Sequence, residues 1–229
     1  FLINNKNLIS NVENIIFNKS LSKKFIDFID QILKLKNINK RLLLIDKKIY
    51  LLQKSYCPTI LGRRYSISKN INFLENIGNE LNVTEKLNNS NYKKIYISRE
   101  DSKNRKILNE KELITFLKKI DFNIITLSKL DIFSQINIFK NAKIIIGYHG
   151  AGLANLVFTS SSAKLIEIHP RTKNDLREHF KIISNLKNIH HSFFFVDYKS
   201  NKEDSENLTY FDGIVDINKF EKFLKEHLS

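Results

Sequence analysis

The chain has 229 residues, and its balance of 42% hydrophobic to 27% charged residues excludes wholesale disorder. Lys and Arg outnumber Asp and Glu by 38 to 24, so the formal charge is +14 and polyanionic partners are favoured: nucleic acid, acidic lipid head groups or a diphosphate. The single cysteine, Cys57, excludes an intrachain disulfide framework and a cysteine-rich zinc site. No apolar run approaches the roughly 20 residues of a membrane helix, and no signal-peptide pattern opens the chain.

The first part of the chain, residues 1–91, has an irregular pattern of elements. It begins with Phe1 rather than Met, so we expect the sequence to be a piece of a longer chain. The polar cluster Asn88–Asn91 is typical of a turn and marks the predicted boundary to a second domain, residues 92–229. Apolar spacing and short apolar runs predict helices over Leu21–Leu35 and Ile67–Leu81 and strands over Leu42–Ile45 and Ile49–Leu52.

The second part alternates regularly between strands and helices. Such an alternation predicts βαβ units, and therefore a parallel sheet with helices on both faces. The run Ile144–Ile146 is apolar without alternation, which favours a central, buried strand, and Asp131 is the expected N-cap of a helix. The predicted strands are Ile95–Ile97, Asn123–Leu127, Lys143–Gly147, Lys164–Ile168 and Ser192–Val196, and the predicted helices are Glu110–Lys119, Asp131–Lys140, Ala151–Phe158, Asn174–Leu186 and Asp216–Leu228.

A glycine-rich loop, Gly147–Asn155, follows the third of these strands and opens a helix. Glycines let a backbone approach a ligand closely, and a helix N-terminus offers N–H groups and a positive dipole end to a phosphate. The alternative is a tight turn that lets the helix pack on the sheet. His149 lies within the loop and is a titratable group at the same crevice, although a lone histidine is more often structural.

Basic residues gather after the first of these strands. Between Lys93 and Lys106 there are six basic residues against two acidic ones. Arg99 ends the strand and Arg105 lies in the following loop, where guanidinium groups can bind phosphate oxygens bidentately. For Lys103 and Lys106, a merely solvated loop explains the charge equally well.

Glu167 ends the next strand along the chain, where a carboxylate can accept hydrogen bonds from ribose hydroxyls. The alternative is a surface glutamate at a strand end. The sequence holds no Asp-x-Asp pair, no Walker loop, no His-Glu-x-x-His and no Gly-x-Ser-x-Gly elbow. The pair His190–His191 lacks a third ligand at a useful spacing, so we predict no metal site.

Several separate motifs follow one another in order between Lys93 and Pro170. They are Tyr96-Ile97-Ser98-Arg99, Arg105, Asn109-Glu110, Leu130–Gln135, Ala142, Gly147-x-His149-Gly150-Ala151-Gly152-Leu153-x-Asn155-x-x-Phe158 and Glu167-Ile168-x-Pro170. This order resembles the signature of glycosyltransferase family 61. The resemblance covers about a third of the chain and weakens before Asn91.

The resemblance implies a GT-B-like α/β fold. In such a fold the C-terminal, Rossmann-like domain holds a nucleotide sugar, and the N-terminal part faces the acceptor. Here residues 1–91 form that acceptor-side region, which is short for a complete acceptor domain. The residues expected to bind the donor are Arg99, Arg105, Asn109, Gly150, Ala151, Gly152, Leu153, Asn155 and Glu167.

The activity implied by the resemblance is an inverting, metal-independent transfer of a sugar from a nucleotide-diphosphate donor to a carbohydrate or glycan acceptor, in surface or capsular polysaccharide synthesis. No cofactor is expected beside the donor. His149 is the candidate catalytic base, with Asp101, Glu100 or a residue of the N-terminal part as alternatives. We expect a cytoplasmic protein, associated with the inner face of the membrane and not with nucleic acid.

Two other classes of function are compatible with parts of the sequence. A nucleotide-binding fold can act as a non-catalytic partner subunit, which agrees with the short N-terminal part. A basic nucleic-acid-binding module would rest on the charge of +14 alone, since no helix-turn-helix, RNP or zinc-finger pattern is present.

Overall fold

The computed structural model describes residues 9–46, 55, 71, 75–80, 92–171, 179–200 and 211–228. The chain forms two compact units, residues 1–83 and 84–229. The predicted boundary after Asn91 lies outside the described residues, as does the predicted strand Ile49–Leu52. Of the predicted helix Ile67–Leu81, Ile71 and residues 75–80 are described, and they are helical.

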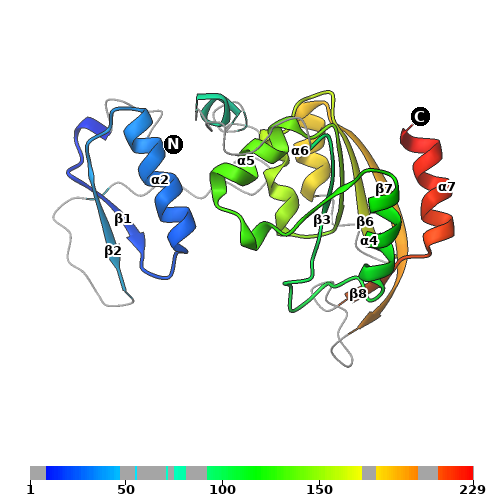
Figure 1. The fold of residues 1–229 in the computed structure, drawn as a ribbon. Coiled ribbons are helices and arrows are strands. Elements are labelled where there is room, and N and C mark those ends of the chain that lie inside the picture. Colours follow the sequence, from blue (N-terminus) through cyan, green and yellow to red (C-terminus); the bar gives the residue numbers. More distant parts are fainter. Residues whose placement is uncertain are drawn as a thin grey trace. The chain divides into compact units, whose positions relative to one another are not determined.

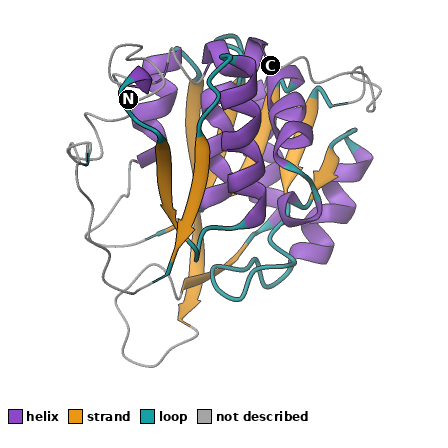
Figure 2. Ribbon diagram, turned by 90° about the vertical axis from the view of Figure 1, so that its left-hand side faces the viewer, coloured by secondary structure: helices purple, strands orange, loops and turns teal. Residues whose placement is uncertain are grey.

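The first unit contains a βαβ arrangement (Figure 1). Strand β1 (Asn14–Asn18), helix α2 (Lys23–Leu35) and strand β2 (Arg41–Ile45) follow one another, and the two strands pair in parallel (Figure 2). The side chain of Ser22 accepts a hydrogen bond from the backbone N–H of Phe25, so it caps α2. The helix and β2 confirm the sequence prediction, whereas β1 was not predicted.

The second unit is built on a six-stranded sheet. Its strands are β3 (Lys94–Ile97), β4 (Asn123–Ile125), β5 (Ile144–Tyr148), β6 (Lys164–Pro170), β7 (His190–Ser200) and β8 (Phe211–Ile214). Their spatial order is β4-β3-β5-β6-β7-β8, and β3 to β7 are all parallel. The second strand of the unit lies on one side of β3 and the third on the other, so the winding direction reverses between β3 and β5. In open α/β sheets, ligands bind outside the carboxyl ends of the strands at such a point.

Helices cover both faces of this sheet, as predicted. Helices α5 and α6 lie on one side, and α4 and α7 lie on the other (Figure 1). Tyr96, Ile146 and Phe220 belong to the buried cluster that joins the sheet to α4 and α7. None of the helices in the described ranges is both long and apolar enough to cross a membrane. The helices are α4 (Glu110–Lys119), the 3-10 helix η3 (Leu127–Lys129), α5 (Ile132–Asn141), the 3-10 helix η4 (Ala151–Phe158), α6 (His179–Lys187) and α7 (Ile217–Leu228).

The second unit differs from the sequence prediction in several elements. Leu127, predicted to end a strand, begins the 3-10 helix η3 instead. Strand β8 was missed and runs antiparallel to β7, so the sheet is mostly rather than wholly parallel. Because β8 pairs with Asp197–Ser200, β7 continues past the predicted end at Val196. The helix predicted over Ala151–Phe158 is present with these bounds, and it is of the 3-10 type. Asp131 caps α5 as predicted, accepting a hydrogen bond of 2.9 Å from the backbone N–H of Ser134.

Strand β8 also holds a distant segment of the chain. Backbone hydrogen bonds link Gly213 to Lys106 and to Leu108, each at 2.8 Å. The backbone N–H of Lys106 donates to a carboxylate oxygen of Asp212 at 2.8 Å. Residues 106–109 are thus fixed by residues from near the end of the chain.

Candidate functional site

A cavity of about 270 Å³ opens where the winding of the sheet reverses. Ile97 and the residues after it supply one wall from the end of β3, and Tyr148 and Gly152 supply another from the end of β5. Leu127 of η3 adds apolar surface. Arg99 and Asp101 are its charged residues, so the cavity combines apolar lining with a cation and a carboxylate.

Arg99 is held in place by its own loop, residues 99–106, which we call the cavity loop. Its Nε donates to the carbonyl oxygen of Arg105 at 2.6 Å, and its Nη2 donates to Ser102 Oγ at 2.6 Å and to the Asn104 carbonyl oxygen at 2.9 Å. Burial lowers the pKa of Arg99, and the neighbouring charge of Arg105 lowers it further. The guanidinium is therefore pre-organised, and its Nη1 is left beside Gly150.

Gly150 is required by the position of Arg99. A Cβ atom built on Gly150 would collide with Nη1 of Arg99, so only glycine allows the guanidinium to lie against this turn. Gly152 lies closer to apolar groups, and a Cβ atom there would be 2.7 Å from Cδ1 of Leu127 and 3.4 Å from Cγ2 of Ile97. The predicted glycine loop is thus brought to the predicted basic loop. Of the residues between and after these glycines, Ala151 is exposed and Leu153 is buried at the cavity wall.

Arg105 adopts an unusual backbone conformation, with a φ of 57°, in the left-handed region that a residue with a side chain seldom occupies. Its carbonyl oxygen accepts the hydrogen bond from Arg99 Nε. Such conformations concentrate at functional sites, where the surrounding structure holds them. The two predicted arginines therefore lie together, and one of them shapes the loop that anchors the other.

Glu110 is a site residue that sequence reasoning missed. One of its carboxylate oxygens accepts hydrogen bonds from the Tyr96 hydroxyl at 2.8 Å and from the backbone N–H of Arg99 at 2.9 Å. Glu110 begins α4, where a negative charge also suits the helix dipole. Its place in the motif Asn109-Glu110 was the available signal.

The side chains of Asn109 and Asn155 lie in structural contacts. The Asn109 amide donates to the Val215 carbonyl oxygen at 2.7 Å and accepts from the Val215 N–H at 3.0 Å. The Asn155 amide donates to Gln135 Oε1 at 3.0 Å and so joins η4 to α5. Donor binding by these two residues stays a prediction, because the contacts of both side chains are structural.

Tyr148 lines the cavity, and the hydroxyl end of its ring is held by β8. Its hydroxyl donates to the carbonyl oxygen of Phe211 at 2.9 Å. A Cβ atom on Gly213 would lie 2.7 Å from Cε2 of the ring, so β8 approaches closely because residue 213 is glycine. Burial raises the pKa of Tyr148, and the charge of Asp212 raises it further, so the hydroxyl stays protonated.

His149, Glu167 and His191 form a second cluster, which we call the buried trio. Gly147 of β5 pairs with Glu167 of β6, so His149, two residues beyond Gly147, is on the same face as Glu167. His149 Nδ1 contacts Oε1 of Glu167, and His191 Nε2 lies 3.0 Å from Oε2. The exposed fractions of the three side chains are 4%, 0% and 4%.

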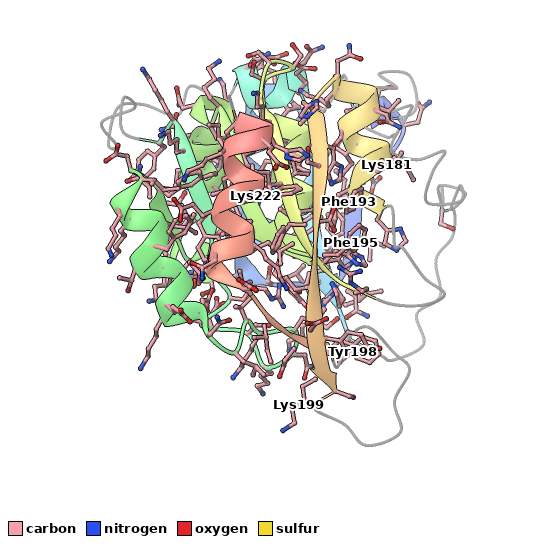
Figure 3. The ribbon with its side chains drawn as sticks, turned by 90° about the vertical axis from the view of Figure 1, so that its right-hand side faces the viewer. Lys181, Phe193, Phe195, Tyr198, Lys199 and Lys222 are labelled. Atoms are coloured by element: carbon pink, nitrogen blue, oxygen red, sulfur yellow. The ribbon has the colours of Figure 1, made fainter. Side chains whose placement is uncertain are left out.

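Aromatic rings surround the buried trio. The ring of Phe180, in the first turn of α6, lies 5.3 Å from that of His149, and the ring of His191 stacks on Phe193 at 4.4 Å. Figure 3 labels Phe193 and Phe195 along β7, and their rings stack at 6.0 Å. Tyr148 points to the other face of the sheet, into the cluster shared with α4 and α7. His149 is therefore not among the residues that line the cavity.

Glu167 occupies a different environment from the open strand end that was expected for it. Burial alone would raise the pKa of its carboxyl group, but hydrogen bonds from His149 and His191 outweigh that effect and lower the pKa. Both carboxylate oxygens already face histidines. Contact with a ribose stays a prediction, and it would have to compete with these partners.

His149, Glu167 and His169 are the residues in the described ranges whose types could hold a metal ion, with ligand atoms within 4.8 Å of one another. Bonds of about 2.0–2.1 Å around tetrahedral zinc keep ligand atoms about 3.4 Å apart. The Glu167 oxygens serve two histidines, and His169 Nδ1 lies 2.9 Å from the carbonyl oxygen of its neighbour Pro170. The arrangement therefore fits a hydrogen-bonded network better than a metal site.

In a mostly parallel α/β sheet, the switch point where Arg99 is held is the usual place for a bound ligand. The sequence matches the family Glycosyltransferase 61 over residues 7–173, and the chain therefore belongs to glycosyltransferase family 61. The match confirms the resemblance inferred from the motifs.

Curated relatives match a part of the chain. The EGF domain-specific O-linked N-acetylglucosamine transferase of Drosophila melanogaster is 38% identical over 77 residues, which is 32% of this chain and 15% of the relative. The proteins of that name from Pan troglodytes and Mus musculus are each 31% identical over 105 residues, 42% of this chain and 19% of the relative. The aligned part thus spans less than a fifth of these relatives.

Proposed function

We propose that this chain transfers a sugar, with inversion, from a nucleotide-diphosphate donor to a carbohydrate or glycan acceptor. Membership of glycosyltransferase family 61 supports glycosyl transfer as the class of reaction. The main support for a nucleotide-diphosphate donor is the guanidinium of Arg99, which three hydrogen bonds fix at the switch point of the sheet. A surface polysaccharide is our proposed product, and the GT-B arrangement is our proposed fold.

The leaving diphosphate needs positive charge at a fixed place. The guanidinium groups of Arg99 and the neighbouring Arg105 supply positive charge. Helix η4 begins just after Gly150, so the backbone N–H groups of its first turn lie next to Arg99. Because Arg99 is bonded before any ligand arrives, little reorganisation is needed when charge develops in the transition state. The cavity volume of about 270 Å³ is just below the common range of about 300–1,000 Å³, so we expect it to take one part of the donor.

The acceptor hydroxyl needs a base, and His149 is our first candidate. It directly follows Tyr148, which lines the cavity, but its own ring is buried outside that lining, so this role requires Nε2 to become accessible when the substrates bind. Asp101 is the second candidate, because it lines the cavity itself. Glu100 is less suited, since its carboxylate is bound by Lys129 at 2.6 Å and by Thr126 at 2.8 Å.

We propose that no divalent metal takes part. The sequence has no Asp-x-Asp pair to carry one, and two arginines can neutralise the diphosphate in its place. Transfer measured in EDTA should equal transfer in buffer with magnesium or manganese. Loss of transfer in EDTA, restored by adding either ion, would contradict this part of the proposal.

The decisive experiment is a binding comparison on the whole chain. Calorimetry with a panel of nucleotide-diphosphate sugars should find a preferred donor, whose transfer to candidate glycans is then followed. Random oligonucleotides in a salt series provide the comparison, because a nucleic-acid-binding module would show steep salt dependence and no nucleotide preference. Donor binding without transfer to any glycan would instead favour a non-catalytic partner subunit.

A further inference from the structure

The buried trio places one fully buried carboxylate between two histidines. Glu167 has an exposed fraction of 0%, and it contacts His149 Nδ1 through one oxygen and His191 Nε2, at 3.0 Å, through the other. Three neighbouring strands contribute: Glu167 lies in β6, His191 in β7, and His149 just beyond β5. An isolated buried carboxylate is costly, and here the cost is offset by the hydrogen bond to His149 and by the nearby nitrogen of His191.

The charge of the carboxylate determines where the hydrogens lie. The histidines lower the pKa of Glu167, so the group is ionised near neutral pH, and an ionised carboxylate only accepts hydrogen bonds. His149 must then carry a hydrogen on Nδ1, the nitrogen that is bonded to Oε1 of Glu167. In its neutral form, His149 therefore has its lone pair on Nε2.

We propose that Glu167 is a positioning residue that fixes His149 in the tautomer with a hydrogen on Nδ1, so that Nε2 receives the proton of the acceptor hydroxyl. The catalytic part of this inference rests on the proposed glycosyl transfer. His191 Nε2 lies 3.0 Å from the other oxygen and so adds a second, weaker contact to the carboxylate.

The reaction then balances as follows. The acceptor oxygen forms a bond to the anomeric carbon of the donor, and its proton passes to Nε2 of His149. The bond between that carbon and the phosphate oxygen breaks, and the nucleoside diphosphate leaves with the electron pair. The imidazolium that results is stabilised by the Glu167 carboxylate on Nδ1, as a buried carboxylate does in other enzymes with a histidine base.

The variant Glu167→Gln keeps the size of the side chain and removes its charge. An amide has one oxygen, so it can accept from one of the two histidines, and its NH₂ group then faces the other. Glu167→Asp keeps the charge on a shorter side chain. Ser184→Ala is the matched control, because it removes a different fully buried polar group from α6.

The first measurement is the ¹⁵N–¹H spectrum of the histidine rings in the wild-type chain, which reports the tautomer directly. We expect His149 to carry its hydrogen on Nδ1. The second is the split between turnover and donor affinity: Glu167→Gln should lower kcat by about 100-fold or more with donor Kd changed less than about twofold. Glu167→Asp should retain more turnover than Glu167→Gln, and Ser184→Ala should retain all of it.

Three results would overturn the proposal. They are a hydrogen on Nε2 of His149 in the wild type, normal kcat in a folded Glu167→Gln chain, and one equivalent of tightly bound metal in the purified protein. If Glu167→Gln does not fold, the wild-type spectrum and Glu167→Asp still decide. If the wild type binds no nucleotide sugar, the proposed function fails, while the spectrum still decides whether Glu167 fixes the tautomer.

Discussion

The cavity loop follows the carboxyl end of β3, whereas the buried trio reaches into the sheet at Glu167 of β6 and His191 of β7, and the two hold their charges in opposite ways. In the cavity loop, Arg99 is half-buried and is bonded mainly to backbone carbonyl groups of its own loop. In the buried trio, Glu167 is fully buried and is bonded to side chains from two other strands. The charge of Arg99 is held by residues close in the sequence and lines a cavity. The charge of Glu167 is held by residues of neighbouring strands and lines no cavity in the described part of the chain.

The difference indicates which effects each site can show. A half-exposed cation fixed by its own loop can meet a ligand, so its loss should appear first in binding. A buried carboxylate with two partners holds strands together, so its loss should appear in stability even before it appears in the reaction. The following variants test that contrast, starting with the largest expected effect.

Glu167→Ala should destabilise the fold most. Removing the carboxylate leaves two buried histidine side chains without their acceptor, and breaking a buried pair in this way costs about 3–5 kcal/mol. Denaturant unfolding followed by circular dichroism measures the loss. A loss below about 1 kcal/mol would mean that the trio contributes little to the fold and would erase the contrast.

The pH dependence of stability should reveal the same carboxylate. Its pKa in the folded chain lies below the ordinary value of 4.5, so it stabilises the fold fully above pH 4.5 and loses that contribution as the pH falls through the folded pKa. Melting temperatures recorded on acidification should therefore fall more steeply for the wild type than for Glu167→Gln. Parallel curves for the two proteins would show that Glu167 is not ionised in the folded state.

Arg99→Ala should weaken donor binding by about 1.5–3 kcal/mol, or roughly 10- to 150-fold, because charge-assisted hydrogen bonds are lost. Some stability should be lost as well, since Arg99 closes the cavity loop. Arg99→Lys should not restore binding, because an ammonium group cannot replace the planar fork. Lys103→Ala is the control for charge in the same loop, and equal donor affinity for Lys103→Ala and Arg99→Ala would show that net charge alone matters.

Gly150→Ala should reproduce part of the Arg99 defect without changing the arginine. The added methyl group collides with Nη1, so Arg99 must move or the turn must open, at about 1–3 kcal/mol. Gly152→Ala is the comparison, because its methyl group meets the end of the flexible Leu127 side chain. Donor titrations should show the larger loss for Gly150→Ala, and the reverse order would place the ligand against Gly152.

Asn109→Ala should have the smallest effect, a loss of about 1–2 kcal/mol in stability from the broken pair with Val215. Donor affinity should stay unchanged once the protein is folded. A clear loss of affinity at full folding would return Asn109 to the donor site, where the sequence placed it.

Local patterns in the sequence predicted much of the second unit. The alternation of strands and helices, the cap at Asp131 and the loops after β3 and β5 all follow from short-range spacing. Strand β8 could not be found this way, since Phe211–Ile214 contains aspartate and glycine, which are poor strand formers. Its pairing with β7 also depends on contacts distant in the sequence.

The sequence predicted the loops of the candidate site, but not the contacts between Glu167 and the two histidines. Arg99 and Gly150 were expected near one ligand, and the structure brings them into contact. The burial of Glu167 depends on the register of β5, β6 and β7, which no single motif encodes. For the same reason no local pattern indicates that His191 lies beside Glu167, which is 24 positions earlier and on the adjacent strand.

The link between β8 and residues 106–109 also sets the order of assembly during synthesis. Lys106 and Asp212 are separated by 106 positions, so the far end of the cavity loop stays unsecured until β8 has left the ribosome. A nascent chain stopped before residue 211 would contain every motif of the family and still lack the hydrogen bonds between β8 and residues 106–108. Competence to bind a donor should therefore arise late, with the final strand of the sheet, and not when the last family motif has been translated.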